Sequence, residues 1–123
     1  MGTSADQSYI DGWRQRERAL AAAAASWRRD RLSEAADAAR QVRERFPSVR
    51  RVVLFGSLAR GTAGPGSDVD LWLEGLPESD WLDAVSLVRQ SIRNAEVDVV
   101  RAEWARAPIA ARVAAEGVVL SGG

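Results

Sequence analysis

The sequence contains no cysteine and no histidine, and these two absences narrow the chemistry that it can carry out. Without cysteine there is no disulfide framework and no thiolate metal site. Without histidine there is no imidazole general base, no serine protease-type triad and no usual zinc ligand. Catalysis would therefore depend on carboxylates, hydroxyls and arginine, and a metal bound through oxygen ligands would be a hard ion such as Mg²⁺.

Lysine is absent as well, so that all 17 basic residues are arginine, and 17 acidic residues balance them to a net charge of zero. Any phosphate contact would be made by a guanidinium group. No strongly basic field is available to hold a long nucleic acid, and we expect none as a partner. No apolar run approaches the roughly 20 residues of a membrane span, so we expect a cytoplasmic protein that does not enter a membrane.

The 123 residues are enough for one structural domain, with little room for a separate substrate domain. Residues 1–47 form a predicted N-terminal helical extension, rich in Ala, Arg, Glu and Leu. Its apolar stripe predicts either one long helix or two helices that break near residues 26–30. Trp13 and Trp27 belong to that stripe, and we expect them to pack in the core. Pro47 ends the helical pattern.

Residues 48–123 form the predicted catalytic core, in which strands and helices alternate. The expected strands are 51–55, 67–73, 95–101 and 118–120, and the expected helices run from about Ser79 or Asp80 to Arg93 and from Pro108 to Glu116. Residues 61–66, with the sequence GTAGPG, form a loop, and Gly117 stands where a helix-ending glycine belongs. The order predicts an α+β fold, a small mixed sheet with helices packed on it.

Gly56 and Ser57 directly follow the first predicted strand. A strand that ends in Gly-Ser exposes backbone N–H groups at the turn, and these groups, with the Ser57 hydroxyl, are able to hold phosphate oxygens. Gly56 allows a phosphate to approach the backbone closely. Arg60 lies one helical turn onward and is either a further phosphate contact or half of a structural ion pair.

Asp68 and Asp70 stand two residues apart in a strand of strictly alternating character, so they lie on one face of the sheet. Two such carboxylates repel each other unless a cation lies between them. In the next predicted strand Val97 and Val99 face one way and Asp98 the other. If the two strands are neighbours, all three carboxylates can converge on one sheet face, as two-metal phosphoryl chemistry requires. Trp72 shares this face and either stacks on a base or packs under the N-terminal helices.

The run LFGSLARGTAGPGSDVDLWLEG resembles the signature of the DNA-polymerase-beta-like nucleotidyltransferases, and is most similar to their minimal, single-domain branch. The shared pattern is Gly-Ser, about ten residues, Asp-x-Asp, and a third Asp on a later strand. The resemblance covers roughly residues 49–120. It implies that Asp68 and Asp70 bind two Mg²⁺ ions and that Asp98 binds the catalytic ion and helps to deprotonate the acceptor.

The resemblance further implies that Gly56 and Ser57 hold the triphosphate of ATP or another nucleotide, with Ser67 assisting. The acceptor oxygen would attack the α-phosphorus in line and pyrophosphate would leave. Minimal nucleotidyltransferases are commonly paired with a HEPN-type helical protein as antitoxin and toxin, so the expected acceptor is a hydroxyl on such a partner. The alternatives are a non-catalytic module that masks a partner, and an enzyme acting on a small molecule such as an aminoglycoside. A homodimer is the alternative assembly.

Overall fold

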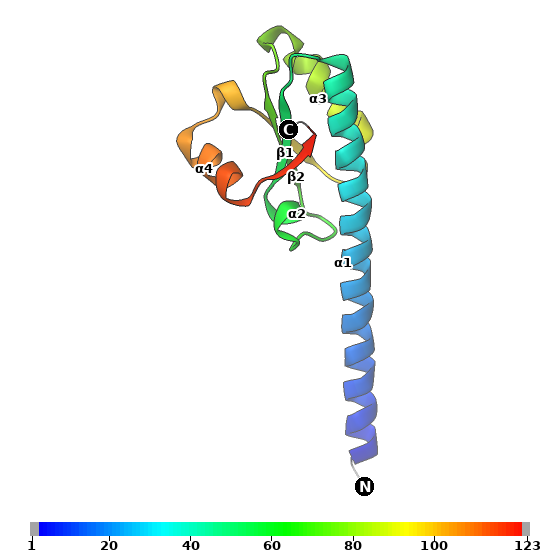
Figure 1. Cartoon of the computed structure of the whole chain (residues 1–123). Helices are drawn as coiled ribbons and strands as arrows, with labels where there is room; N and C mark the ends of the chain where they lie inside the picture. Colours follow the sequence, from blue (N-terminus) through cyan, green and yellow to red (C-terminus); the bar gives the residue numbers. More distant parts are fainter. Residues whose placement is uncertain (1–2, 122–123) are drawn as a thin grey trace.

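The structure, a computed structural model of the chain, describes residues 3–121 and has the predicted α+β fold (Figure 1). A four-stranded mixed sheet carries helices on both faces. In chain order the elements are α1 (Thr3–Arg45), β1 (Arg51–Phe55), α2 (Ser57–Arg60), β2 (Val69–Glu74), η1 (Glu78–Asp80), α3 (Trp81–Ser91), β3 (Val97–Arg101), η2 (Ala102–Trp104), α4 (Ala107–Glu116) and β4 (Val118–Ser121). The predicted boundaries of the core elements fall within a few residues of these.

The sheet has the strand order β3-β2-β1-β4. β1 lies between two antiparallel neighbours, β2 and β4, whereas β3 runs parallel to β2. A parallel pair needs a crossover connection, and α3 supplies it between β2 and β3. The mixed sheet that the sequence predicts is therefore confirmed.

The main core lies between the sheet and the helices α1 and α3. Strand residues such as Leu54 and Leu71 point toward this side, and each is fully buried. The α1 residues that meet them are small: Ala35, Ala38 and Ala39 are also fully buried. Alanine side chains allow the helix axis to lie close to the sheet, so the C-terminal half of α1 is part of the core.

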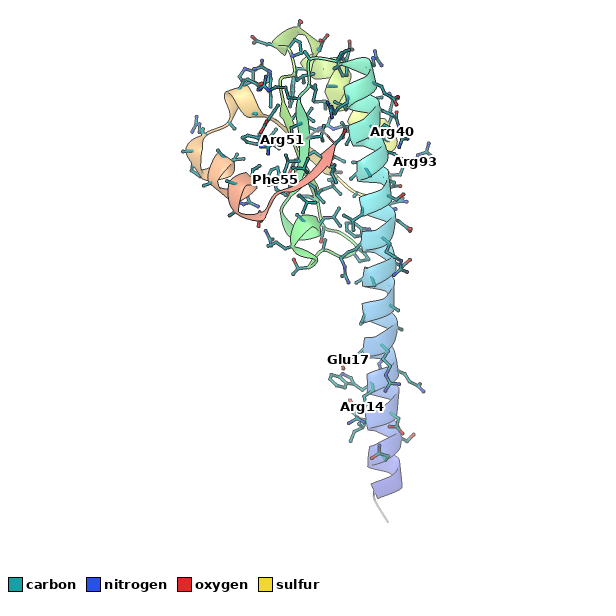
Figure 2. The ribbon with its side chains drawn as sticks, in the orientation of Figure 1. Arg14, Glu17, Arg40, Arg51, Phe55 and Arg93 are labelled. Carbon is teal, nitrogen blue, oxygen red and sulfur yellow. The ribbon has the colours of Figure 1, made fainter. Side chains whose placement is uncertain are left out.

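The N-terminal half of α1 projects past the sheet as a continuous helix (Figures 1 and 2). Of the two alternatives, one long helix is correct. Trp27 packs partly against the core, but Trp13 is 51% exposed, so the expectation that both tryptophans are core residues is wrong for Trp13. At the level of Arg14, the next residue along the chain, the helix has passed the end of the sheet (Figure 2). None of the helices in residues 3–121 has the length and apolar character that a membrane span requires.

A second, smaller core lies on the opposite face of the sheet, under α4. It consists of Val53, Phe55, Trp72 and Val113. Trp72 is 7% exposed, and its indole N–H donates to Glu74 at 2.9 Å. Trp72 therefore packs under α4 instead of stacking on a base or lying under the N-terminal helix, because its strand position points away from α1.

Gly117 joins α4 to β4 and has an extended conformation, with φ −66° and ψ 141°. Gly117 thus follows the helix end as predicted, but it does so without the left-handed conformation that is common for such glycines. A side chain at this position would overlap the Val113 carbonyl oxygen and lie 2.7 Å from the Val53 side chain. Glycine is needed here because the chain passes close to its neighbours.

We predict that Gly117→Ala lowers the free energy of unfolding by roughly 1–3 kcal/mol, the usual cost of overpacking a well-packed site. Gly64→Ala is the matched control, because its nearest neighbour would be the Ala24 Cβ at 3.7 Å, an ordinary contact. Urea unfolding of the two variants measures both effects. Equal stability of the two variants would show that the close passage at Gly117 does not constrain the fold.

Candidate active site

The turn after β1 is shaped around the side chain of Asp70. Phe55 and Asp70 face each other across the antiparallel β1–β2 pair, so the next residue, Gly56, lies against the Asp70 carboxyl group. Gly56 has φ +79°, and an added Cβ would overlap an Asp70 carboxylate oxygen. Glycine satisfies both the left-handed backbone and the close approach. Ser57 then begins α2, which is a single turn of helix.

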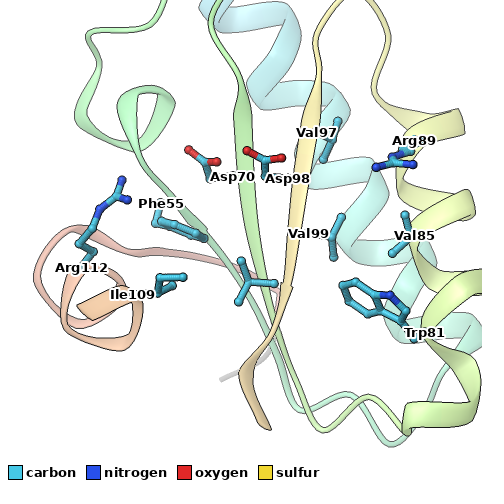
Figure 3. Close-up of a pocket in the computed structure, with 11 residues that line it drawn as sticks. Phe55, Asp70, Trp81, Val85, Arg89, Val97, Asp98, Val99, Ile109 and Arg112 are labelled. Atoms are coloured by element: carbon cyan, nitrogen blue, oxygen red, sulfur yellow. The ribbon is translucent and has the colours of Figure 1, made fainter. Parts of the chain in front are cut away.

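Asp70 and Asp98 lie side by side in register on the parallel strands β2 and β3 (Figure 3). Both line a hollow of about 420 Å³ between α3 and α4. Arg112 of α4 reaches toward the same hollow, and its guanidinium lies 5.6 Å from the centre of the Phe55 ring. β2 and β3 are neighbours, as predicted, and they bring two carboxylates together at one end of an open groove.

The Asp70 carboxyl group has a raised pKa. Burial is the largest cause, and the nearby Asp98 carboxylate raises the pKa further. Arg112 opposes the shift, while Asp68 and Glu116 add smaller contributions in the raising direction. Ionisation of Asp70 in the folded chain therefore carries an electrostatic cost, and a cation at this position would reduce that cost.

Asp68 lies just before β2 and is exposed. Within residues 3–121 there is no group of three acidic side chains close enough together to hold one metal ion. The sequence predicted that Asp68, Asp70 and Asp98 converge, and the structure brings together Asp70 and Asp98. Asp68 stands outside the strand pairing that aligns the other two, because the strand begins one residue after it.

Ser67 and Arg60, both predicted nucleotide contacts, have partners within the protein. The Ser67 hydroxyl accepts a hydrogen bond from the Gly64 N–H at 3.0 Å and so closes the loop of residues 61–66. Arg60 forms an ion pair with Glu116 at 2.7 Å. In this structure Arg60 is therefore half of a structural ion pair, which was the second of the two alternatives.

Glu116, at the end of α4, is a site residue that the sequence reasoning missed. One of its carboxylate oxygens accepts the Gly56 N–H at 3.1 Å, and the other accepts Arg60. The hydrogen bond from Arg60 lowers the pKa of Glu116, with a smaller contribution from the Gly56 N–H. Glu116 thus joins α4 to both ends of the α2 turn. No local pattern signals this role, because 60 residues separate Glu116 from Gly56.

The model of the nucleotidyltransferase domain family matches residues 36–113. That range contains the Gly56–Ser57 turn and all three predicted aspartates. The chain belongs to the nucleotidyltransferase domain family. The family that the sequence motif indicated is therefore confirmed, and the match starts inside the half of α1 that packs on the sheet. No curated protein sequence matches this nucleotidyltransferase significantly.

Several solved structures share the fold of this nucleotidyltransferase. A chain in a toxin–antitoxin complex with AMP-PNP is 23% identical, with a TM-score of 0.59 over 68% of this chain and 69% of that one. A chain in the complex of a tri-AMPylated HEPN toxin with its MNT antitoxin, from Shewanella oneidensis, is 20% identical, with a TM-score of 0.51 over 66% and 63%. A candidate nucleotidyltransferase from Sulfolobus solfataricus is 25% identical, with a TM-score of 0.53 over 79% and 85%.

We predict that Gly56→Ala reduces nucleotide transfer by about 100-fold, because displacing the turn or Asp70 by about 1 Å misplaces the reacting groups. Gly61→Ala is the matched control: Gly61 has the same φ of +79°, but an added Cβ would meet nothing within 4 Å. Gly61→Ala costs about 1–2 kcal/mol at its left-handed φ and ψ. Gly56→Ala costs more, because its ψ of −159° lies in a region that only glycine readily adopts. Both variants are therefore compared in a thermal unfolding assay and, under conditions where both are folded, in a transfer assay. Equal activity in the two variants would show that the contact with Asp70 is unimportant.

We predict that Asp70→Asn raises the melting temperature by a few degrees at pH 7 when no metal is added. The folded pKa of Asp70 lies above its ordinary value, so ionising this group opposes folding at every pH above both values. The penalty shrinks as the pH falls below the folded pKa, and it disappears below the ordinary pKa, where both the folded and the unfolded state are protonated. Calorimetry from pH 7 to pH 3.5 should therefore show that the difference in melting temperature between Asp70→Asn and the wild type shrinks as the pH falls. A constant difference would contradict an origin in the ionisation of Asp70.

Proposed function

We propose that this nucleotidyltransferase transfers AMP from ATP to a hydroxyl group on a partner protein, in the manner of an antitoxin that modifies a HEPN-type toxin. The observation that carries the proposal is the alignment of Asp70 with Asp98 directly beside the Gly56–Ser57 turn. The fold shared with toxin–antitoxin complexes, one containing AMP-PNP and one an AMPylated toxin, supports the choice of nucleotide and partner.

The side chains at the site fit Mg²⁺. The available ligands are carboxylate oxygens, which are the ligands that this ion prefers. Burial and, to a smaller extent, the neighbouring Asp98 carboxylate raise the pKa of Asp70, and a divalent cation would favour its ionised form. We propose that Asp70 and Asp98 hold one metal ion, and that Asp68 with Asp70 contacts the second of the two expected ions. The bound metal would neutralise charge on the triphosphate and on the two facing carboxylates.

Each residue of the site has a separate task in the proposed reaction. The backbone N–H groups and the hydroxyl at Ser57 bind the triphosphate, and Glu116 holds the turn in place by binding the Gly56 N–H. Asp98 accepts the proton of the acceptor hydroxyl. The acceptor oxygen forms a bond to the α-phosphorus while the bond from that phosphorus to pyrophosphate breaks. The protein contributes chiefly position and electrostatic stabilisation.

A protein that only masks its partner does not require two neighbouring carboxylates, Asp70 and Asp98, beside the Gly56–Ser57 turn. Asp70 is half-buried beside Asp98, and its ionisation opposes folding. Such an electrostatic cost is typical of sites where the charge takes part in chemistry. The geometry therefore favours an enzyme over a purely masking protein.

The test is to incubate the chain with Mg²⁺, α-labelled ATP and the helical protein encoded beside it. We expect label on that protein, and a loss of roughly 100- to 1,000-fold in Asp70→Asn and Asp98→Asn, since each removes a charge at the reacting centre. Asp83→Asn, an exposed position on α3, is the control and should retain activity.

Two further measurements sharpen this test. Mg²⁺ with a non-hydrolysable ATP analogue should raise the melting temperature of the wild type, because a ligand that binds only the folded state stabilises it. Transfer from γ-labelled ATP should leave no label on the acceptor. Label from the γ-position, or undiminished transfer by Asp70→Asn, would contradict the proposed reaction.

A further inference from the structure

One edge of the sheet, along β3, is unpaired. In residues 3–121, β3 pairs with β2 alone and is the last strand in the sheet order. The Val69 N–H donates to the Glu96 carbonyl oxygen at 2.9 Å, which shows that the backbone groups of Glu96 face β2. Because these groups alternate sides along a strand, those of Asp98 also face β2. The backbone N–H and C=O groups of Val97 and Val99 therefore point to the open edge.

Two hollows follow this open edge. The first, of about 420 Å³, contains Asp70 and Asp98, and the second, of about 310 Å³, reaches Trp104. Both are lined by the same four residues, namely Trp81, Val99, Val100 and Ile109. The two hollows are thus parts of one groove that runs along β3 from the facing carboxylates to Trp104. Figure 3 shows its first part, with Trp81 and Val85 of α3 on one side and Ile109 of α4 on the other.

The far end of the groove presents an exposed aromatic surface. Trp104 is 48% exposed and meets Trp81 edge to face, with ring centres 5.3 Å apart. The guanidinium of Arg101 lies 4.7 Å from the centre of the Trp104 ring and donates to the Leu76 carbonyl oxygen. These contacts fix the orientation of Trp104 while leaving half of its surface open. A rigid, half-exposed aromatic side chain is typical of a binding position for an apolar group.

The charged groups around the groove beyond the two aspartates are positive. Arg89 and Arg112 line the first hollow, and Arg101 and Arg106 line the second. Arg89 and Arg106 are exposed, and neither has an ion-pair partner among residues 7–121, whose side chains the structure describes. Four arginines along one groove favour an anionic occupant and oppose a polycationic one such as an aminoglycoside.

We propose that this groove binds an extended, acidic segment of the acceptor protein, which adds to the sheet as a strand beside β3. The backbone of the segment would pair with the outward N–H and C=O groups of Val97 and Val99. Its hydroxyl residue would lie next to Asp98, an apolar residue would contact Trp104, and its acidic residues would meet the arginines. The inference rests on the proposed function, because it names how that reaction selects its acceptor.

The backbone pairing is tested with two substitutions at one position. Val99→Pro removes the outward N–H but no hydrogen bond to β2, and proline is tolerated at such edge positions. Val99→Ala shortens the side chain and keeps the N–H. We expect Val99→Pro to raise the KM for the acceptor protein by about three- to tenfold over Val99→Ala, the effect of one hydrogen bond, with equal ATP affinity and equal circular dichroism. Equal KM values in the two variants would overturn the proposal.

The chemistry of the segment is tested by peptide binding, without ATP or metal. The probes are two capped hexapeptides with one tyrosine and two leucines, which differ in carrying three glutamates or three lysines. Tryptophan fluorescence of the full chain should report binding of the glutamate peptide, weakened about tenfold by Trp104→Ala and unchanged by Trp13→Ala, an equally exposed tryptophan outside the groove. Tighter binding of the lysine peptide, or equal effects of the two tryptophan variants, would overturn the proposal.

The two assays separate this proposal from the proposed function. Because peptide binding needs no transfer, a wild type that binds the glutamate peptide through Trp104 but labels no protein would support the groove and contradict the reaction. A wild type that labels its partner while Val99→Pro and Val99→Ala behave alike would support the reaction and overturn the groove.

Discussion

The register between β1 and β2 is the constraint on which the rest of the site depends. It places Phe55 opposite Asp70, and the chain must then turn directly beside a carboxyl group. Only glycine fits at that turn, so the Gly56–Ser57 turn and the acidic residues meet although the loop of residues 61–66 separates them in sequence. The parallel register of β2 with β3 adds Asp98 to the same place. A shift by one residue would turn these side chains to the other face of the sheet.

The two faces of the sheet have different roles as a result. The face under α1 and α3 is a closed apolar core, and it supplies the stability that the other face lacks. On the α4 face only four buried residues form a core, next to carboxylates that repel each other. Glu116 connects this small core to the Gly56–Ser57 turn, and the charge of Arg60 balances it. Helix α4 therefore positions the turn of the site, while the core under α1 and α3 provides most of the buried apolar surface of the fold.

Local pattern was sufficient to predict most of the fold. The alternation of residues 69–73 indicated which side chains face the core, and the spacing of Gly56, Ser57, Asp68 and Asp70 indicated the family. The features that escaped prediction depend on contacts between distant segments. The packing of Trp72 under α4, the hydrogen bond from Gly56 to Glu116 and the close passage at Gly117 all require knowledge of where α4 lies. The sequence left open whether α1 is one helix or two, and it gave no sign that Trp13 would be exposed.

The open edge of β3 would connect the fold to the selection of an acceptor. An unpaired strand is a risk of non-specific aggregation, which proteins reduce by keeping edge strands short and by placing charges beside them. β3 has five residues, and Arg89 and Arg106 stand at the hollows on its open side. Those charges repel basic segments and leave the edge accessible to acidic ones. The same arginines that protect the edge from unselective pairing would then choose the segment that is brought to Asp98, so that protection and specificity have one physical cause.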